Sequence, residues 1–152
     1  MSKSVCTVRE ATLADMDVLA KLFNQYREFY GKAPDHLGAA AFLSAHLNQA
    51  RSQIFVAQIS EQLVGFIQLY PLWSSLEMGR VWVINDLFIQ ADHRGKSIGQ
   101  ALMQQGIAFA KAHDAVYIAL ETGMDNLRAQ KLYQKLGFVI EDGIYHLHLN
   151  CK

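Results

Sequence analysis

A short turn of small and basic residues is the segment best suited to bind an anion. It reads Arg94-Gly95-Lys96-Ser97-Ile98-Gly99 and joins an apolar segment to one with helical apolar spacing. Small residues at a helix start let several backbone N–H groups point at one spot, where a phosphate is favoured. Arg94 and Lys96 would add positive charge. An ordinary βα turn is the alternative interpretation.

Other phosphate ligands fit this turn less well. It lacks the Lys-Ser/Thr ending of a nucleotide P-loop and the Gly-x-Gly-x-x-Gly spacing of a dinucleotide fold. The sequence also offers no convincing magnesium site, which use of a nucleoside triphosphate would need. The turn therefore favours a phosphate or pyrophosphate without nucleotide hydrolysis.

Two polar residues interrupt the apolar run 81–89 that precedes the turn. They are Asn85 and Asp86. A carboxyl group in such a strand is costly unless it is paired or functional, so Asp86 is the first candidate for a general base. The alternative is a structural carboxylate satisfied by backbone groups or by Arg80. Asn85 cannot act as a base and could only orient water or substrate.

The surrounding sequence predicts alternating strands and helices that would position these residues. Apolar periodicity and stop signals predict strands over 5–10, 54–59, 63–72, 81–89 and 116–120, and helices over 12–30, 37–50, 99–113 and 126–135. Segments 54–59 and 63–72 are typical of an antiparallel hairpin, which we expect Pro71 and the loop 73–79 to end. Asp142-Gly143 predicts a last antiparallel pair, 138–141 with 144–149.

Composition limits the classes of protein and partner. The chain has 152 residues, 51% of them hydrophobic, with 14 basic and 14 acidic side chains. These values predict a single domain over 1–152 and argue against nucleic acid as the main ligand. Because no signal-peptide or membrane-length apolar run occurs, we expect a cytoplasmic protein that does not bind membranes.

No metal site is expected. Cys6 and Cys151 lie near opposite ends of the chain without zinc-type spacing, so both are interpreted as incidental thiols. His146 and His148 are two residues apart on one predicted strand face, a spacing that can hold a metal. A third ligand is missing from the sequence nearby, which favours surface or interface histidines.

Two blocks of the sequence resemble the GCN5-related N-acetyltransferase (GNAT) superfamily. Residues 83–89, the turn 94–99 and Ala101-Leu102-Met103 resemble its acetyl-CoA signature, in which Arg/Gln-x-x-Gly-x-Gly/Ala embraces the pyrophosphate. Residues 126–138 are similar to its second conserved block. The family usually has Gly at the position of Ser97. If Ser97 keeps a helical backbone, its N–H can still serve the phosphate and coenzyme binding should survive.

The resemblance implies a fold and a cleft. The fold is α/β, with a mixed, mostly antiparallel central sheet in the order β-α-α-β-β-β-α-β-α-β-β and helices on both faces. The strand before the turn would carry a β-bulge and splay from 116–120, leaving backbone groups for the pantetheine arm. Amides near Leu87 or Phe88 would then bind the thioester oxygen.

The resemblance also assigns chemical roles. Tyr133 matches the family's tyrosine near the sulfur and would protonate the coenzyme A thiolate; core packing is the alternative. Asn126 lies two helical turns earlier on the same face. The base that deprotonates the amine is not assigned by the resemblance, since related enzymes place an acid where this chain has Asn85; the candidate from the residues themselves is Asp86, with Glu121 and Glu77 in reserve. The expected contacts of the acetyl-CoA co-substrate are Leu87, Phe88, Ile89, Arg94, Gly95, Lys96, Ser97, Ile98, Gly99, Asn126, Arg128 and Tyr133.

The acceptor side is implied to lie over residues 26–36 and 70–80. Its aromatic and acidic residues suit an ammonium group, and the expected substrate contacts are Tyr26, Tyr30, Trp73, Asn85 and Glu121. A small-molecule amine is favoured, such as a polyamine or an amino acid. A protein lysine or N-terminus, or an acetyl-CoA sensor without turnover, are the alternatives. The apolar segment 70–76 predicts a homodimer.

Overall fold

The computed structural model describes residues 5–152, and its contacts divide the chain into two compact units. The first unit ends at Glu121 and the second begins at Thr122. Each unit is described by itself below. The expectation of a single domain over residues 1–152 stays a prediction, and residues 1–4 lie outside the described part of the chain.

The first unit is built on a five-stranded mixed sheet. Its strands are β1 (Cys6–Glu10), β2 (Gln53–Ile59), β3 (Gln62–Ser74), β4 (Gly79–Ile89) and β5 (Ala115–Leu120). They lie in sequence order across the sheet. The first four are antiparallel to their neighbours, whereas β5 runs parallel to β4. The predicted mixed, mostly antiparallel α/β sheet is therefore confirmed.

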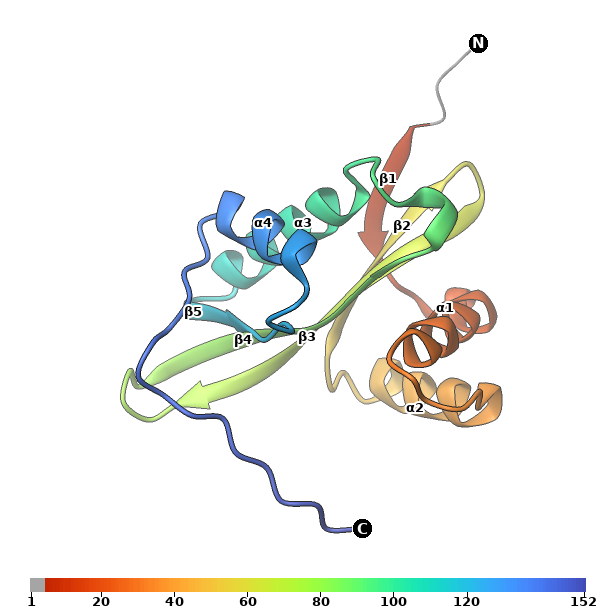
Figure 1. Cartoon of the computed structure of the whole chain (residues 1–152). Coiled ribbons are helices and arrows are strands. Elements are labelled where there is room, and N and C mark those ends of the chain that lie inside the picture. Colours follow the sequence, from red (N-terminus) through yellow and green to blue (C-terminus); the bar gives the residue numbers. More distant parts are fainter. Residues whose placement is uncertain (1–4) are drawn as a thin grey trace. The chain divides into compact units, whose positions relative to one another are not determined.

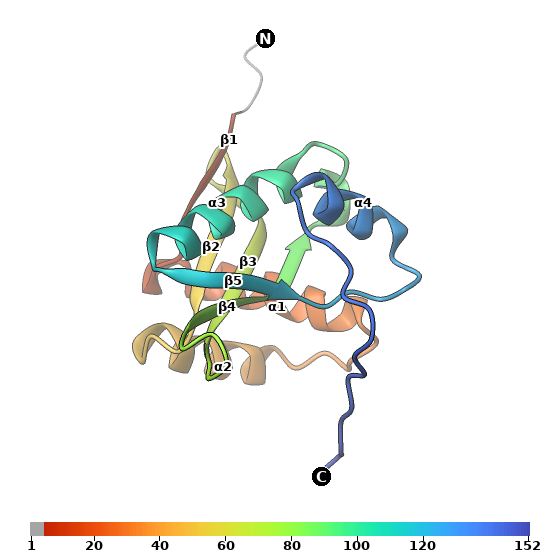
Figure 2. The same cartoon turned by 90° about the vertical axis from the view of Figure 1, so that its left-hand side faces the viewer.

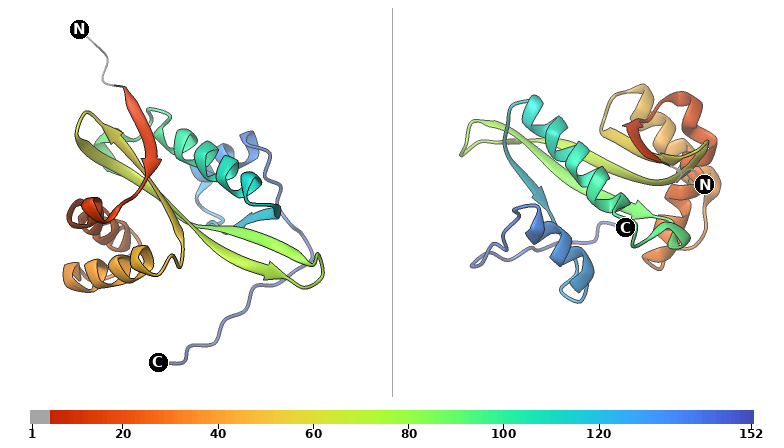
Figure 3. Two further views of the ribbon diagram at one scale, coloured as in Figure 1. Left: turned by 180° about the vertical axis from the view of Figure 1, so that it is seen from behind. Right: turned by 90° about the horizontal axis from the view of Figure 1, so that it is seen from above.

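Helices cover both faces of this sheet. A short 3₁₀ turn, Leu13–Asp15, leads into α1 (Met16–Phe29), and α2 (His36–Asn48) follows. Helix α1 and helix α2 lie on one face, and α3 (Ile98–Ala112) crosses the other (Figures 1 and 2). The view from above in Figure 3 separates the two layers again.

The alternation of side chains along β3 explains this arrangement. Phe66 points toward α1, where its ring lies 6.0 Å from that of Phe23. Ile67, one residue on, points to the opposite face, and a Cβ atom placed on Gly106 of α3 would lie 3.1 Å from its Cδ1. Because successive side chains in a strand face opposite sides, a strand covered on both faces must be apolar throughout.

The start of the first helix is fixed by a paired carboxylate. Asp15 accepts a hydrogen bond of 2.8 Å from the backbone N–H of Thr12, as in a capping box. It also accepts bonds of 2.8 and 2.7 Å from the Arg9 guanidinium. The Arg9 hydrogen bonds hold the pKa of Asp15 below its usual range. This pair connects β1 to the helix that carries Tyr26.

The prediction that Pro71 ends β3 was wrong. The strand continues through Pro71 to Ser74, and Pro71 lies opposite Trp82 of β4. Pairing of β3 with β2 has already ended at Leu69, so the missing N–H of Pro71 costs no bond in that ladder. The β3–β4 pair consequently extends beyond β2 (Figure 3).

The second unit differs from the sequence expectation. It contains α4 (Leu127–Lys135), whose first turn is capped by the Asn126 side chain. The strands predicted over 138–141 and 144–149 are absent, although Gly143 has the positive φ of 87° that suits a turn. A two-stranded hairpin is marginal by itself, and within residues 122–152 the structure offers no further strand to pair with it.

Close packing of β3 against β4 should make Gly65 intolerant of a side chain. A Cβ atom at Gly65 would lie 2.7 Å from the Phe88 carbonyl oxygen. We expect Gly65→Ala to lower the free energy of unfolding by about 1–3 kcal/mol, because backbone atoms must shift. Urea denaturation measures the change, with Gln62→Ala at the exposed start of the same strand as control. Equal stability of the two variants would contradict the register described here.

Candidate functional site

A β-bulge in β4 marks the centre of the candidate site. Gln68 of β3 lies opposite Asp86, whereas Leu69 lies opposite Ile84, so Asn85 is an additional residue on β4. The parallel pairing of β4 with β5 ends at the same level, at Ile84 and Leu120. The register confirms the predicted bulge, and the pairing of β4 with β5 stops where β5 ends, so the splaying of these two strands stays a prediction.

Beyond the bulge, β4 has one edge that β5 does not cover. The Gln90 N–H donates to Val64 O at 2.8 Å, so Gln90 points its backbone groups toward β3. In an antiparallel pair, the backbone N–H and C=O groups of successive residues point alternately toward the partner strand and away from it. The N–H groups of Leu87 and Ile89 therefore point away from β3, to the side that β5 does not cover. The Ile89 carbonyl oxygen faces that side too, where it accepts from Arg94 Nε at 3.0 Å. The amide of Phe88 faces β3 instead.

The turn 94–99 reverses the chain through left-handed residues. Gly95 has φ 78° and Ser97 has φ 62°, and α3 begins at Ile98. The helical backbone considered for Ser97 is therefore wrong. The chain goes from extended Arg94 to the helix within three residues, and left-handed steps make that reversal. Left-handed residues beside right-handed ones direct N–H groups toward one concave spot, a geometry that binds anions.

Arg94 packs against aromatic rings. Its guanidinium carbon lies 5.2 Å from the ring centre of Phe29 and 5.6 Å from that of Phe88. These contacts join the turn to α1 and β4. Lys96 is exposed in the turn and can add positive charge there.

Among the described residues, no group of three or more His, Cys, Asp or Glu side chains is arranged to hold a metal ion.

Asp86 is buried, with 6% of its surface exposed, and three side chains donate to it. Tyr26 Oη and Asn85 Nδ2 donate to Oδ1 at 2.7 and 3.0 Å, and Gln68 Nε2 donates to Oδ2 at 2.6 Å. The donors come from α1, β4 and β3. Arg80, considered as a partner, instead packs over the rings of Trp73 and Trp82, at 4.4 and 5.6 Å.

A second layer of polar groups supports this carboxylate. Gln68 is fully buried, and its Oε1 accepts from the Ser52 hydroxyl at 2.6 Å. The Asp86 carboxylate only accepts, so the NH₂ end of Gln68 faces it, and the Ser52 hydroxyl then donates to the amide oxygen at the other end. Sequence reasoning missed Gln68, although it is the single polar residue in the otherwise apolar and aromatic run 63–70.

Half-buried Tyr70 and buried His46 form another hydrogen-bonded pair near the carboxylate. The Tyr70 hydroxyl lies 3.2 Å from His46 Nε2, and His46 Nδ1 lies 2.8 Å from Phe42 O. A carbonyl oxygen only accepts, so Nδ1 carries the proton and the Tyr70 phenol donates to Nε2. Burial, and to a smaller extent the charge of Asp86, raises the pKa of Tyr70 to about 12. The phenol stays protonated at neutral pH.

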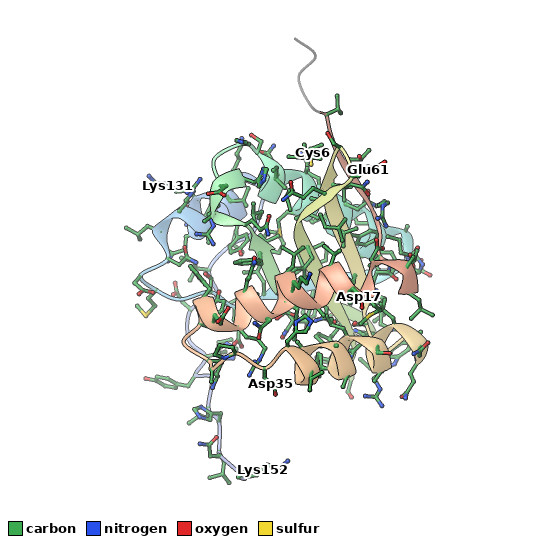
Figure 4. All side chains as sticks on the ribbon, turned by 90° about the vertical axis from the view of Figure 1, so that its right-hand side faces the viewer. Cys6, Asp17, Asp35, Glu61, Lys131 and Lys152 are labelled. Carbon is green, nitrogen blue, oxygen red and sulfur yellow. The ribbon has the colours of Figure 1, made fainter. Side chains whose placement is uncertain are left out.

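A pocket opens between α1 and α2 beside this network. Its volume is about 450 Å³, and its lining consists of Phe23, Tyr26, Arg27, Tyr30, Lys32, Asp35, Gly38, Ala39 and Phe42. Figure 4 views this face of the first unit and places Asp35 at the beginning of α2. Tyr26 connects the pocket to Asp86 through its hydroxyl. Of the lining, sequence reasoning did not single out Phe23, Arg27, Lys32 or Phe42.

The predicted substrate residues separate into two groups. Tyr26 and Tyr30 line the pocket, with ring centres 5.1 Å apart, and Asn85 touches Asp86. Glu121 follows the last β5 residue, where pairing with β4 ends. Trp73 lies five residues beyond Gln68 on β3, about 17 Å along the strand, and is 68% exposed. The structure therefore does not bring Trp73 to the pocket.

Three predicted residues belong to the second unit. Asn126 accepts from the Ala129 N–H at 3.3 Å as the cap of α4. Arg128 is exposed in the first turn of that helix. Tyr133, seven residues after Asn126, is half-buried, and its ring lies 6.1 Å from that of Phe138. Their roles toward the coenzyme stay predictions.

Replacing Gln68 should reveal how strongly the fold depends on the Asp86 network. Gln68→Leu keeps most of the volume but leaves Asp86 Oδ2 without its donor. We expect a loss of about 1–3 kcal/mol in the free energy of unfolding, measured by urea denaturation. Ser52→Ala, which leaves that donor in place, should cost less. A Gln68→Leu protein as stable as the Ser52→Ala protein would show that the network is not stabilising.

Substitutions at Ser97 should report the strain of its left-handed backbone. A non-glycine residue pays about 1–2 kcal/mol there, while glycine gains entropy in the unfolded chain. We therefore expect Ser97→Gly to raise the free energy of unfolding by up to about 1 kcal/mol. Ser97→Val should lower it, because a β-branched side chain tolerates positive φ worst. Unfolding in urea compares the two variants, and a Val variant as stable as the Gly variant would refute the strain.

Known proteins share this sequence and architecture. Residues 18–138 match the model of the acetyltransferase (GNAT) family. An uncharacterized N-acetyltransferase of Bacillus subtilis, YhfO, is 39% identical over 143 residues, which cover 94% of this chain and 96% of the relative. A probable acetyltransferase of Haemophilus influenzae is 32% identical over 90% of this chain and 94% of its own.

The fold agrees with these relatives. The crystal structure of a probable acetyltransferase superposes with a TM-score of 0.90 at 35% identity, covering 96% of this chain and 99% of that one. In residues 5–152 no helix combines the length and apolar character needed to cross a bilayer. The two sequence blocks, the bulged strand and these matches together lead to one conclusion: the chain belongs to the GNAT family and is an N-acetyltransferase.

Proposed function

We propose that the protein transfers the acetyl group of acetyl-CoA to the primary amine of a small molecule, by direct attack in a ternary complex. The observation that carries the proposal is the coincidence of three features in the first unit. The uncovered edge of β4 presents amides, the turn before α3 presents an anion site, and a buried carboxylate lies at the bulge between β3 and β4.

The uncovered edge and the turn suit the coenzyme. The N–H groups of Leu87 and Ile89 can pair with the amides of a pantetheine arm, or with the oxyanion that develops on the thioester carbonyl. The N–H groups around Gly95 and Ser97 can receive the pyrophosphate. Ser97 has a φ of 62°, a left-handed backbone conformation that favours glycine. This conformation explains why family members usually have glycine at this position.

The amine must lose a proton before it attacks. A lysine-like ammonium has a pKa near ~10.4. Asp86 receives two hydrogen bonds on Oδ1 and one on Oδ2, whereas a carboxylate offers about four acceptor sites. One site is left for an ammonium or for a water molecule. Asp86 therefore holds the cationic end of the acceptor and takes its proton, directly or through water.

The acceptor is a small molecule because the pocket beside Asp86 is of that scale. Its volume of about 450 Å³ falls in the range of small-molecule sites. A sensor without turnover would not need a carboxylate at the end of such a pocket.

Cytoplasmic location and a homodimer stay predictions. The dimer is supported by the exposed apolar end of the β3–β4 pair, which carries Leu72, Trp73, Leu76 and Met78.

The leaving thiolate needs a proton, and we assign its delivery to Tyr133. Tyr133→Phe should lower kcat about 10²-fold or more, as expected for loss of a general acid, while coenzyme binding changes little. Released thiol is measured from acetyl-CoA with a panel of polyamines, amino acids, aminoglycosides and lysine peptides. Coenzyme affinity is measured by calorimetry.

The matched control is Tyr145→Phe, because Tyr145 is 92% exposed in the second unit. Equal turnover of Tyr133→Phe and Tyr145→Phe would refute the acid role. Acetyl-CoA binding without thiol release across the whole panel would favour a sensor. Release with lysine peptides alone would favour a protein substrate.

A further inference from the structure

The walls of the α1–α2 pocket form a rigid aromatic slot. Phe23 stacks on Phe42 at a centroid distance of 5.5 Å and lies 6.1 Å from Tyr26. Tyr30 meets the Tyr26 ring edge-on at 5.1 Å. Because each ring is held by another, the slot accepts an apolar segment with little rearrangement.

The end of the slot at Tyr26 lies against a buried carboxylate, Asp86, which is not itself part of the lining. The Tyr26 hydroxyl, which belongs to the lining, donates to the buried carboxylate of Asp86 at 2.7 Å. Asp86 carries no cationic partner among the described residues, since its donors are a phenol and two amides. A ligand ammonium is the charge that this end lacks.

The lining of the slot includes two cations, Arg27 and Lys32, besides the carboxylate of Asp35. Arg27 donates from Nη1 to the Ala33 carbonyl oxygen at 3.1 Å, and Lys32 is exposed. Within residues 5–152 neither forms an ion pair with a carboxylate. Both therefore remain available to an anionic group of a ligand.

The carboxylate of Asp35 does not neutralise these cations. It accepts from the Gly38 N–H at 2.9 Å and caps α2, which turns its charge toward the helix start. Gly38 permits this close approach, because a Cβ atom there would collide with the Asp35 carboxylate. The mouth of the pocket thus keeps a net positive charge, opposite in sign to the Asp86 end.

We propose that the acceptor is amphoteric: a primary amine at one end, a carboxylate at the other, and an apolar spacer between them. The amine lies at Asp86, the spacer lies among Phe23, Tyr26 and Phe42, and the carboxylate meets Arg27 and Lys32. This inference rests on the proposed amine acetylation and narrows its substrate class. A polyamine or aminoglycoside would bring a second cation to the positive mouth, where it is repelled.

Three acceptors of equal length test the proposal. They are an ω-aminoalkanoate, its uncharged carboxamide and the corresponding alkanediamine. We expect kcat/KM to be about threefold to tenfold higher for the carboxylate than for the amide, the range of partly exposed ion pairs. The diamine should be poorest. Equal values for acid and amide, or a preference for the diamine, would overturn the proposal.

A charge reversal at the mouth sharpens the test. Lys32→Glu should abolish the preference for the acid over the amide and raise kcat/KM for the diamine. The control is Lys21→Gln, which removes an exposed cation of α1 outside the pocket lining. A Lys32→Glu enzyme with the wild-type order of the three acceptors would contradict the assignment.

Binding separates this inference from the proposed function. Calorimetric affinities of the same three compounds for the wild-type protein and Lys32→Glu need no turnover. If no amine is acetylated, the proposed function fails. The amphoteric pocket is still supported if the wild-type protein binds the ω-aminoalkanoate more tightly than the other two compounds and Lys32→Glu abolishes this difference. Equal affinities for the three compounds would overturn the inference even in an active enzyme.

Discussion

The burial of the Asp86 carboxylate is the constraint on which the arrangement around it depends. A charge in an apolar strand is tolerated only when hydrogen bonds replace its lost hydration. Here the replacements come from three elements, through Tyr26 of α1, Gln68 of β3 and Asn85 of β4. Each bond holds its element at a fixed position. The position of α1 and the pairing of β3 with β4 are therefore connected to one functional group.

The bulge at Asn85 turns this local requirement into a site. An additional residue bends and twists a strand, and pairing of β4 with β5 stops where the bulge occurs. The amides of Leu87 and Ile89, one and three residues after the carboxylate, consequently lie on an edge that β5 does not cover. The same strand leads into the turn before α3. One irregularity thus places a buried carboxylate, backbone amides and the turn close together along the chain.

The sequence predicted most of the first unit because its signals are local. Apolar periodicity located the strands and helices, and the resemblance to a known family supplied the bulge. The errors arose where a neighbouring strand decides the outcome. Pro71 is compatible with β3 because β2 has already ended, and the strong Asp142-Gly143 turn signal yields no strands because a hairpin needs a further partner. Neither fact is encoded within the segment itself.

The site residues show the same division. The turn 94–99 was identifiable from its small residues, but the left-handed φ of Ser97 was not, because a serine by itself favours right-handed or extended backbone. Gln68 could have been found by the argument that identified Asp86, since both are isolated polar residues in buried strands. Arg27, Lys32 and Phe42 could not, because charged and aromatic residues on helices are usually solvated or packed.

Local charge, rather than total charge, carries the chemical information in this protein. The formal net charge is zero, which by itself argues only against a polyelectrolyte partner. Within the first unit, however, the acid Asp86 is held at the sheet behind Tyr26 of the pocket lining, while two cations of that lining, Arg27 and Lys32, lie at and just after the end of α1. This separation of opposite charges is stable because neutral donors satisfy the Asp86 carboxylate, while the Asp35 carboxylate caps helix α2. Hydrogen bonds from neutral donors leave the charges of Asp86 and of the two cations unpaired, whereas a salt bridge between them would cancel these charges.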